Sequence, residues 1–129
     1  MAFILTPKHG ESIMINAWNW RPTIALLLDA KLIDEDTHER LGTHGRCGEI
    51  DEETALGIAD FIESKLNDMK PGDRIRYDLA VTGEPKELAV FSPDGTPPKV
   101  DLVDIYSAKY EWLVMFRDFC RTSGGFDAG

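Results

Sequence analysis

The chain has 129 residues, a length that fits one domain able to bury a core without disulfides or a metal. Its net charge of −9 argues against nucleic acid as a partner, because binding to duplex DNA depends on Lys and Arg side chains that neutralise phosphates. Hydrophobic residues make up 43% and charged residues 29%, which excludes a disordered chain. We expect a single α+β domain over residues 1–129, with about four helices packed with a small antiparallel sheet.

No segment of the sequence has the features of a membrane span or an export signal. The longest uninterrupted apolar runs, such as 24–28 and 112–116, fall far short of the roughly 20 residues that a spanning helix needs. The opening residues lack a basic start, a long apolar region and a cleavage site of small residues. Cys47 and Cys120 are too few for a disulfide framework. We therefore expect a cytoplasmic protein that does not associate with a membrane.

The first residues predict a β-hairpin. Two short runs of apolar and β-branched residues, 3–5 and 12–16, flank a connection that contains Pro7 and Gly10. Proline favours the first corner of a turn and glycine closes it, so the two runs are placed to pair as antiparallel strands.

Two tryptophans and a proline mark the next segment. Trp18 and Trp20 alternate within residues 17–22, which suits an extended segment with both indoles on one side. Pro22 fits the first position of a helix, because its missing N–H would have no partner there in any case. We predict a helix over 22–33 that is apolar nearly all round and deeply buried.

Two helices follow, each led by an aspartate. Asp34 is the predicted N-cap of a short helix over 35–41 that stops at Gly42. Asp51 begins a longer amphipathic helix over 51–69. The apolar face of this longer helix carries Ala55, Ile58, Ala59, Ile62, Leu66 and Met69.

The third quarter of the chain predicts strands and a loop. Residues 74–81 alternate between two faces, which is typical of a half-buried strand. Residues 87–91 are a candidate partner strand. Residues 92–99 hold three prolines and an Asp-Gly pair, which predict a surface loop, and 100–105 form a further candidate strand.

The most strongly patterned stretch is 106–126, where a start signal, an aromatic face and a stop signal occur together. Ser107 is a candidate N-cap for the last helix. Gly124 and Gly125 can take positive φ, so the helix can end there with Phe126 folding back. Between these signals, one arc of the helix is expected to face the core with Trp112, Leu113, Met115, Phe116, Phe119 and Cys120.

The tryptophan segment and the last helix resemble segments of known proteins. The patterns W-x-W-R-P at 18–22 and F-x-x-F-C-R-x-S-G-G-F at 116–126 resemble those of a group of small uncharacterised bacterial proteins, and the similarity extends over most of the chain. That group has no assigned activity, so the resemblance implies no functional residue. It implies only a bacterial, cytoplasmic origin.

A glycine-punctuated loop at 43–48 contains His44, Arg46 and Cys47. A nearby base or positive field lowers the pKa of a thiol and makes it nucleophilic, and the glycines let backbone N–H groups converge on an anion. This pattern indicates a small enzyme or a ligand-binding site. The alternative is a plain connector between two helices, because nothing in the sequence brings the side chains of His44 and Cys47 together.

Metal-binding and catalytic motifs are lacking. The His and Cys residues do not have the paired spacing of a zinc site, and Cys120 falls on the predicted core face. The sequence has no phosphate-binding loop, Rossmann fingerprint, G-x-S-x-G or H-E-x-x-H. It predicts neither a metal nor a cofactor, and it assigns no catalytic residue.

Negative charge is concentrated in residues 29–68, which contain twelve Asp or Glu and four Lys or Arg. Such a surface steers a basic partner and repels nucleic acid. Glu52, Glu53 and Asp60 are the candidate contacts with a basic protein. Alternatively, acidic residues at helix N-termini and on solvated faces need no partner.

One side of the last helix is a second candidate surface. Tyr110, Val114, Arg117 and Arg121 are spaced to lie together, away from the core face. Tyr and Arg are favoured at binding hot spots. The alternative is that the arginines cover the acidic segment through ion pairs of small energy.

The tryptophan segment is a third candidate, because Trp18, Trp20 and Arg21 suit an aromatic binding platform. Large aromatic side chains more often fill a core, and we expect at least one of the two indoles to do so.

The absence of catalytic motifs and the acidic charge together predict a non-enzymatic protein that binds a basic protein, as an inhibitor or an immunity protein does. A small enzyme or ligand-binding protein that uses the 43–48 loop and the Trp18/Trp20 segment is the alternative. A metal-stabilised scaffold is a third hypothesis.

Overall fold

The computed structural model describes residues 2–43, 48–82 and 106–129. These residues form four helices and two small antiparallel sheets, which confirms the predicted α+β fold. The helices are α1 (Ala17–Asp29), α2 (Glu35–Leu41), α3 (Glu52–Asn67) and α5 (Tyr110–Thr122). The strands are β1 (Ala2–Pro7), β2 (Ile13–Asn16), β3 (Gly48–Asp51), β4 (Arg74–Arg76), β5 (Val81–Thr82), β6 (Ser107–Lys109) and β7 (Gly125–Ala128).

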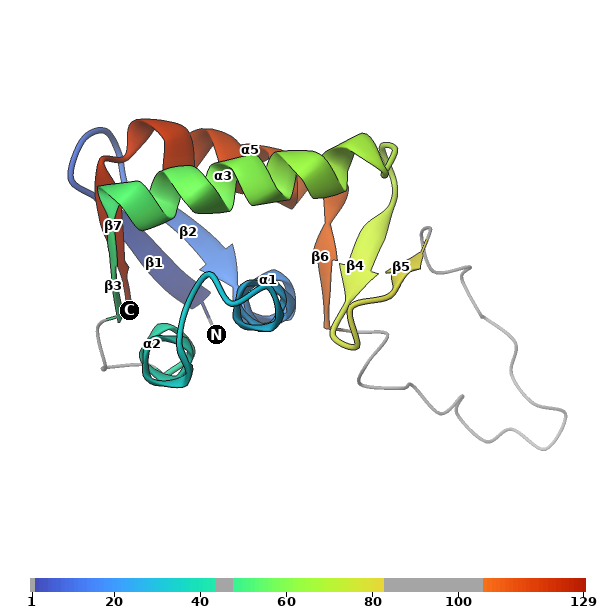
Figure 1. The fold of residues 1–129 in the computed structure, drawn as a ribbon, viewed down its shortest axis with the longest axis horizontal. Coiled ribbons are helices and arrows are strands. Elements are labelled where there is room, and N and C mark those ends of the chain that lie inside the picture. Colours follow the sequence, from blue (N-terminus) through green and yellow to red (C-terminus); the bar gives the residue numbers. More distant parts are fainter. Residues whose placement is uncertain (1, 44–47, 83–105) are drawn as a thin grey trace, which may run out of the picture.

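The larger sheet joins the two ends of the chain. Its strand order is β2-β1-β7-β3, and every neighbouring pair is antiparallel. The β1–β2 hairpin predicted from the sequence is confirmed, with Phe3 opposite Ile15. The C-terminal strand β7 lies between β1 and β3, with Phe126 opposite Ile50. The smaller sheet has the order β5-β4-β6 and lies at the other end of the molecule (Figure 1).

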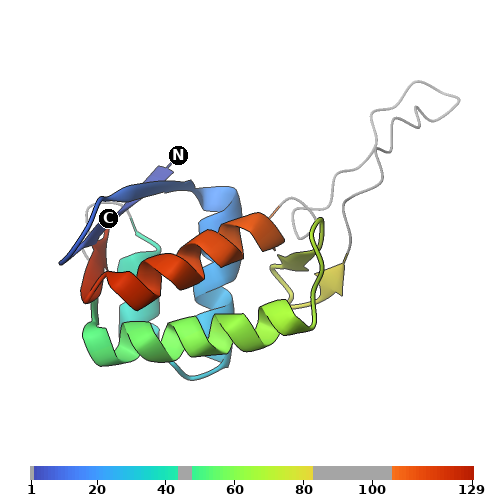
Figure 2. The same cartoon turned by 90° about the horizontal axis from the view of Figure 1, so that it is seen from above.

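The helices lie in two groups between the sheets. In both views α3 and α5 lie side by side, and α1 and α2 lie beneath them (Figures 1 and 2). No helix among the described residues is long and apolar enough to cross a bilayer.

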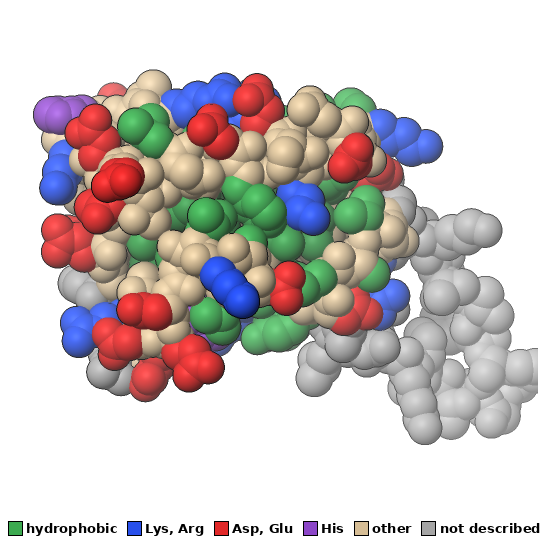
Figure 3. All heavy atoms as spheres, viewed as in Figure 1, with side chains coloured by type: hydrophobic (Ala, Val, Ile, Leu, Met, Phe, Trp, Pro, Cys, Tyr) green, Lys and Arg blue, Asp and Glu red, His purple; other side chains and the backbone are tan. Residues whose placement is uncertain are grey.

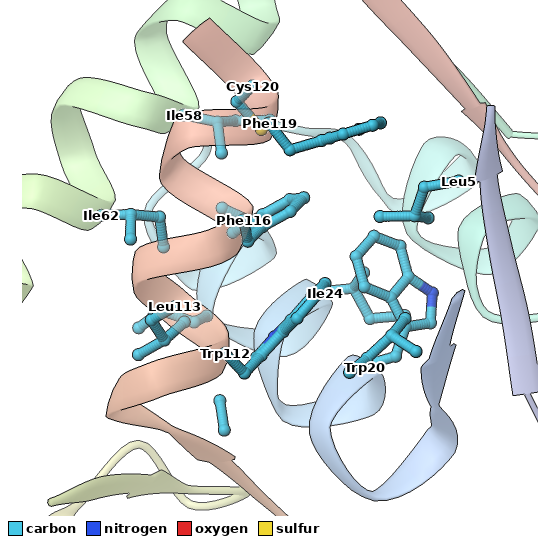
Figure 4. Packing of buried hydrophobic residues seen from close by; sticks show 14 of the residues in the cluster. Leu5, Trp20, Ile24, Ile58, Ile62, Trp112, Leu113, Phe116, Phe119 and Cys120 are labelled. Atoms are coloured by element: carbon cyan, nitrogen blue, oxygen red, sulfur yellow. The ribbon is translucent and has the colours of Figure 1, made fainter. Parts of the chain in front are cut away.

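An aromatic cluster forms the centre of the core. The Trp20 ring on α1 meets the Phe116 ring on α5 edge-on at 5.6 Å between centroids, and Trp112 stacks on Phe116 at 5.3 Å. Figure 4 shows Trp112, Phe116 and Phe119 pointing from α5 towards Trp20 and Leu5. The predicted core face of the last helix is thus buried apart from Met115, which is exposed.

The helix predicted to begin at Pro22 begins five residues earlier, at Ala17. Asn16 is its N-cap and accepts a hydrogen bond from the Asn19 N–H, so the predicted extended segment is helical. Two positions along a helix turn through roughly 200°, so the two indoles face different ways. Trp20 is fully buried and Trp18 is 43% exposed, which corrects the prediction that both lie on one side.

Helix α1 also ends earlier than predicted, at Asp29 rather than residue 33. Lys31 takes φ of 61°, and the N–H groups of Lys31 and Leu32 bond to the carbonyls of Leu28 and Leu27. This is a left-handed helix end of the kind that usually contains glycine. Because the residue at this position is a lysine and not a glycine, no residue type in the sequence marks the end of the helix.

The strand predicted over 74–81 is instead the β4–β5 hairpin. Leu79 takes φ of 71° in its turn, and the Arg76 N–H bonds to the Ala80 carbonyl at 2.8 Å. The predicted alternation of buried and exposed residues therefore fails at both ends, because Arg74 is buried beside Ile75 and Tyr77 is exposed.

The start of the last helix also differs from the prediction. Ser107 lies in β6 and is buried, and the helix begins at Tyr110. The Tyr110 N–H bonds to the Asp73 carbonyl at 2.9 Å, so a neighbouring segment satisfies the donor that a serine cap would have served.

Other predicted boundaries are confirmed. Asp34 and Asp51 cap α2 and α3, and α2 ends at Gly42. Gly124 and Gly125 have φ of 70° and 103° and let the chain turn back into β7. The elements predicted at 87–91, 92–99 and 100–105 lie outside the described residues.

Candidate functional site

Carboxylate side chains gather where α2, β3 and the start of α3 meet. Residues 34–53 contain eight Asp or Glu and two Arg. Figure 3 shows acidic side chains gathered over α2 and around the N-terminal end of α3. We call the surface formed by α2, β3 and the first turns of α3 the acidic face.

A hollow of about 250 Å³ opens on the acidic face. Asp34, Glu49 and Asp51 line it, together with Thr37 and Thr54. Asp34 comes from the start of α2, Glu49 from β3 and Asp51 from the start of α3, so the fold brings together three acidic residues that the sequence keeps apart.

Hydrogen bonds hold two of these carboxylates in place. The Asp34 carboxylate accepts the Thr37 N–H at 2.7 Å, and the Asp51 carboxylate accepts the Thr54 N–H at 2.7 Å. Hydrogen bonds to Thr37 and Thr54 lower the pKa of the Asp34 and Asp51 carboxyl groups below the ordinary value, because each bond favours the charged form. Both groups are therefore fixed negative charges at neutral pH.

The three acidic residues singled out from the sequence lie on α3 and are exposed. Glu52 and Glu53 are in its first turn, next to the hollow, and Asp60 follows two turns later. Leu56 lies between them in sequence and is 43% exposed. The sequence reasoning missed Asp34, Glu49 and Asp51 as one group, because only the packing of β3 between two helix starts brings them together.

The side of α5 that carries Tyr110, Val114, Arg117 and Arg121 contacts carboxylates through its two arginines. An Arg121 guanidinium nitrogen lies 2.6 Å from a Glu63 carboxylate oxygen on α3, and Arg117 lies 3.1 Å from Asp118. Tyr110 and Val114 are half-buried and pack against the core. Arg121 thus pairs with the acidic segment 29–68, as the alternative hypothesis expects, whereas Arg117 pairs with its own neighbour on α5.

The tryptophan segment does not form the predicted platform as a unit. Trp20 is buried and donates its indole N–H to the Leu41 carbonyl at 2.8 Å, which joins α1 to α2. The Arg21 guanidinium lies 5.9 Å from the centre of the buried Phe3 ring. Only Trp18 offers an exposed indole, and it packs against Tyr106 at 4.7 Å between ring centres.

The 43–48 loop is described only at its ends, because His44, Arg46 and Cys47 lie outside the described residues. Among the residues that are described, no group of three or more His, Cys, Asp or Glu is arranged to hold a metal ion. Cys120 is buried, and burial raises the pKa of its thiol above the ordinary value. A thiol in that setting is a poor nucleophile.

Comparison of the chain with family models, with curated proteins and with solved structures finds no match. The resemblance to small bacterial proteins stays a prediction.

Proposed function

We propose that this protein works by binding a basic protein, with the acidic face as the contact surface. The observation that carries the proposal is the hollow lined by Asp34, Glu49 and Asp51. Lys and Arg side chains bring a positive charge on a narrow apolar stem, which suits a small hollow whose lining includes three carboxylates.

Fixed carboxylates support this role. Asp34 and Asp51 are already held by backbone N–H groups at 2.7 Å, so binding does not have to order them. A preorganised surface loses less conformational entropy on association, and this raises affinity.

The outer side of α3 extends the contact surface. Glu53, Leu56 and Asp60 follow one another at i, i+3 and i+7, so they lie along one side of the helix. A partner that covers this side of α3 buries Leu56 between two carboxylates, so apolar burial adds affinity and charge gives orientation. An inhibitor or an immunity protein acts by covering its target, so it needs such a surface and no catalytic group.

The proposal can be tested with a displayed library of random peptides selected on the immobilised protein. The selected peptides are then measured on Glu49→Gln, which removes the carboxylate of the hollow that is not an N-cap, and on a face variant, Glu52→Lys with Glu53→Lys and Asp60→Lys. The matched control is Glu11→Lys with Glu111→Lys and Asp118→Lys, which exchanges three exposed carboxylates outside the acidic face. The face variant and the control change the net charge equally.

We expect the selected peptides to be enriched in Lys and Arg, and to lose roughly tenfold in affinity on the face variant but not on the control. A neutral set, Glu52→Gln with Glu53→Gln and Asp60→Asn, serves if lysine in the first turn of α3 weakens the helix. Equal retention by the face variant and the control would remove the proposal.

A further inference from the structure

A groove separate from the acidic hollow is lined by residues of α1, α2 and the β4–β5 turn. Its volume is about 450 Å³, within the roughly 300–1,000 Å³ of ordinary binding pockets. The described residues that line it are Ala25, Leu28, Asp29, His38, Tyr77 and Leu79.

The lining combines an apolar floor, an aromatic wall and a carboxylate. Ala25, Leu28 and Leu79 supply aliphatic surface, and Tyr77, a residue that is 42% exposed, supplies an aromatic ring. Asp29 is the one carboxylate among the described residues of the groove, and His38 is the other polar side chain besides Tyr77. The groove therefore combines one acidic group with a mostly aliphatic and aromatic lining.

The aromatic wall is held in place from behind. The Tyr77 ring meets the Tyr106 ring edge-on at 6.0 Å, and Tyr106 packs against Trp18 at 4.7 Å. The Tyr77 N–H also bonds to the Tyr106 carbonyl at 2.9 Å. A ring supported in this way presents its surface without losing rotamer entropy on binding.

The turn that carries Tyr77 is strained. Leu79 has φ of 71°, a left-handed conformation that is sterically unfavourable for a residue with a Cβ. The Leu79 N–H bonds to the Arg76 carbonyl at 2.8 Å, and Leu79 packs against the core while lining the groove. Strain of this kind is concentrated at ligand-binding positions.

We propose that this groove receives an arginine side chain of the basic partner. The aliphatic stem lies against Ala25, Leu28 and Leu79, and the guanidinium lies against the Tyr77 ring and the Asp29 carboxylate. Arginine combines these contacts better than lysine, because its planar guanidinium stacks on rings and bonds a carboxylate with two N–H groups. The inference rests on the proposed function, since it names one anchor of the same partner.

The test uses n-butylguanidinium as the probe, titrated into the isotopically labelled protein and followed by NMR. We expect saturable shifts of the Ala25 and Leu79 methyl signals and the Tyr77 ring signals. The neutral analogue n-butylurea has the same stem without the charge, and we expect it to bind about three- to fivefold more weakly. Asp29→Asn is expected to remove most of that difference.

Two outcomes would overturn the inference: no saturable shift at the groove, or equal binding of the guanidinium and the urea. Tyr77→Leu gives a second check, because it keeps apolar surface but removes the ring, and it should weaken the guanidinium alone. The α3 face variant should leave this titration unchanged. Failure of the groove and failure of the acidic face are therefore seen in separate measurements.

Discussion

The indole N–H of Trp112 donates a hydrogen bond to the Thr23 hydroxyl at 2.9 Å, and both side chains are buried. The Thr23 hydroxyl in turn donates to the Asn19 carbonyl at 2.7 Å. The Asn19 side-chain oxygen accepts the Lys109 N–H at 3.0 Å. This chain of bonds joins α1 to α5 and to β6, and it fixes how the segments on either side of the core pack.

Thr23→Val is expected to lower the free energy of unfolding by about 1–3 kcal/mol, because the Trp112 N–H then stays buried without a partner. Thr23→Ser is the control, since it keeps the hydroxyl while losing a methyl group. Urea denaturation measures both variants. A valine variant that is more stable than the serine variant would contradict this role of the hydroxyl.

Lys31→Gly is expected to raise the free energy of unfolding by about 1 kcal/mol, because glycine takes φ of 61° without the steric cost that lysine bears. Ala30→Gly is the matched control one residue earlier. Ala30 has φ of −76°, so glycine there relieves nothing and only loosens the unfolded chain. If both glycine variants change stability alike, the left-handed end of α1 is not the cause.

The N-cap aspartates predict a pH dependence. The folded-state pKa values of Asp34 and Asp51 lie below the ordinary value of 3.8, so their contribution to stability is present above that pH and is lost as the pH falls through the folded values. We expect the melting temperature to decrease steeply below a pH of about 4. Asn is an equally good N-cap without a titrating group, so Asp34→Asn with Asp51→Asn should flatten that decrease. An unchanged pH profile would show that other groups cause it.

The thiol of Cys120 is expected to be inert in the folded protein. It is buried, and burial raises its pKa, so little thiolate is present at pH 8. The measurement is the labelling rate with a thiol reagent in a Cys47→Ser variant, with and without denaturant. Labelling that is as fast in the native as in the denatured protein would mean that α5 does not pack as described.

Local signals in the sequence were sufficient where capping side chains and glycines decide a boundary. Asp34 and Asp51 marked two helix starts, and Gly124 and Gly125 marked the last turn. Lys31 and Leu79 take positive φ without being glycine, so no residue type announced the end of α1 or the β4–β5 turn.

Tertiary contacts decide the remaining features. Pro22 suggested a helix start, but Asn16 caps the helix one residue before Ala17. The sequence identified Glu52 and Glu53 as part of an acidic region. No sequence motif predicts the hollow that Glu49 forms with the N-caps Asp34 and Asp51, and none predicts the groove at Tyr77. Each site depends on segments that meet only in the folded protein.

The most direct test of binding through the acidic face is the dissociation constant of one selected basic peptide, measured by calorimetry at low and high salt. We predict that the Glu52, Glu53 and Asp60 reversal weakens binding roughly tenfold, that the Glu11, Glu111 and Asp118 reversal has little effect, and that salt weakens binding to the unaltered protein. Affinities that are equal for the two reversals, or insensitive to salt, would contradict the account.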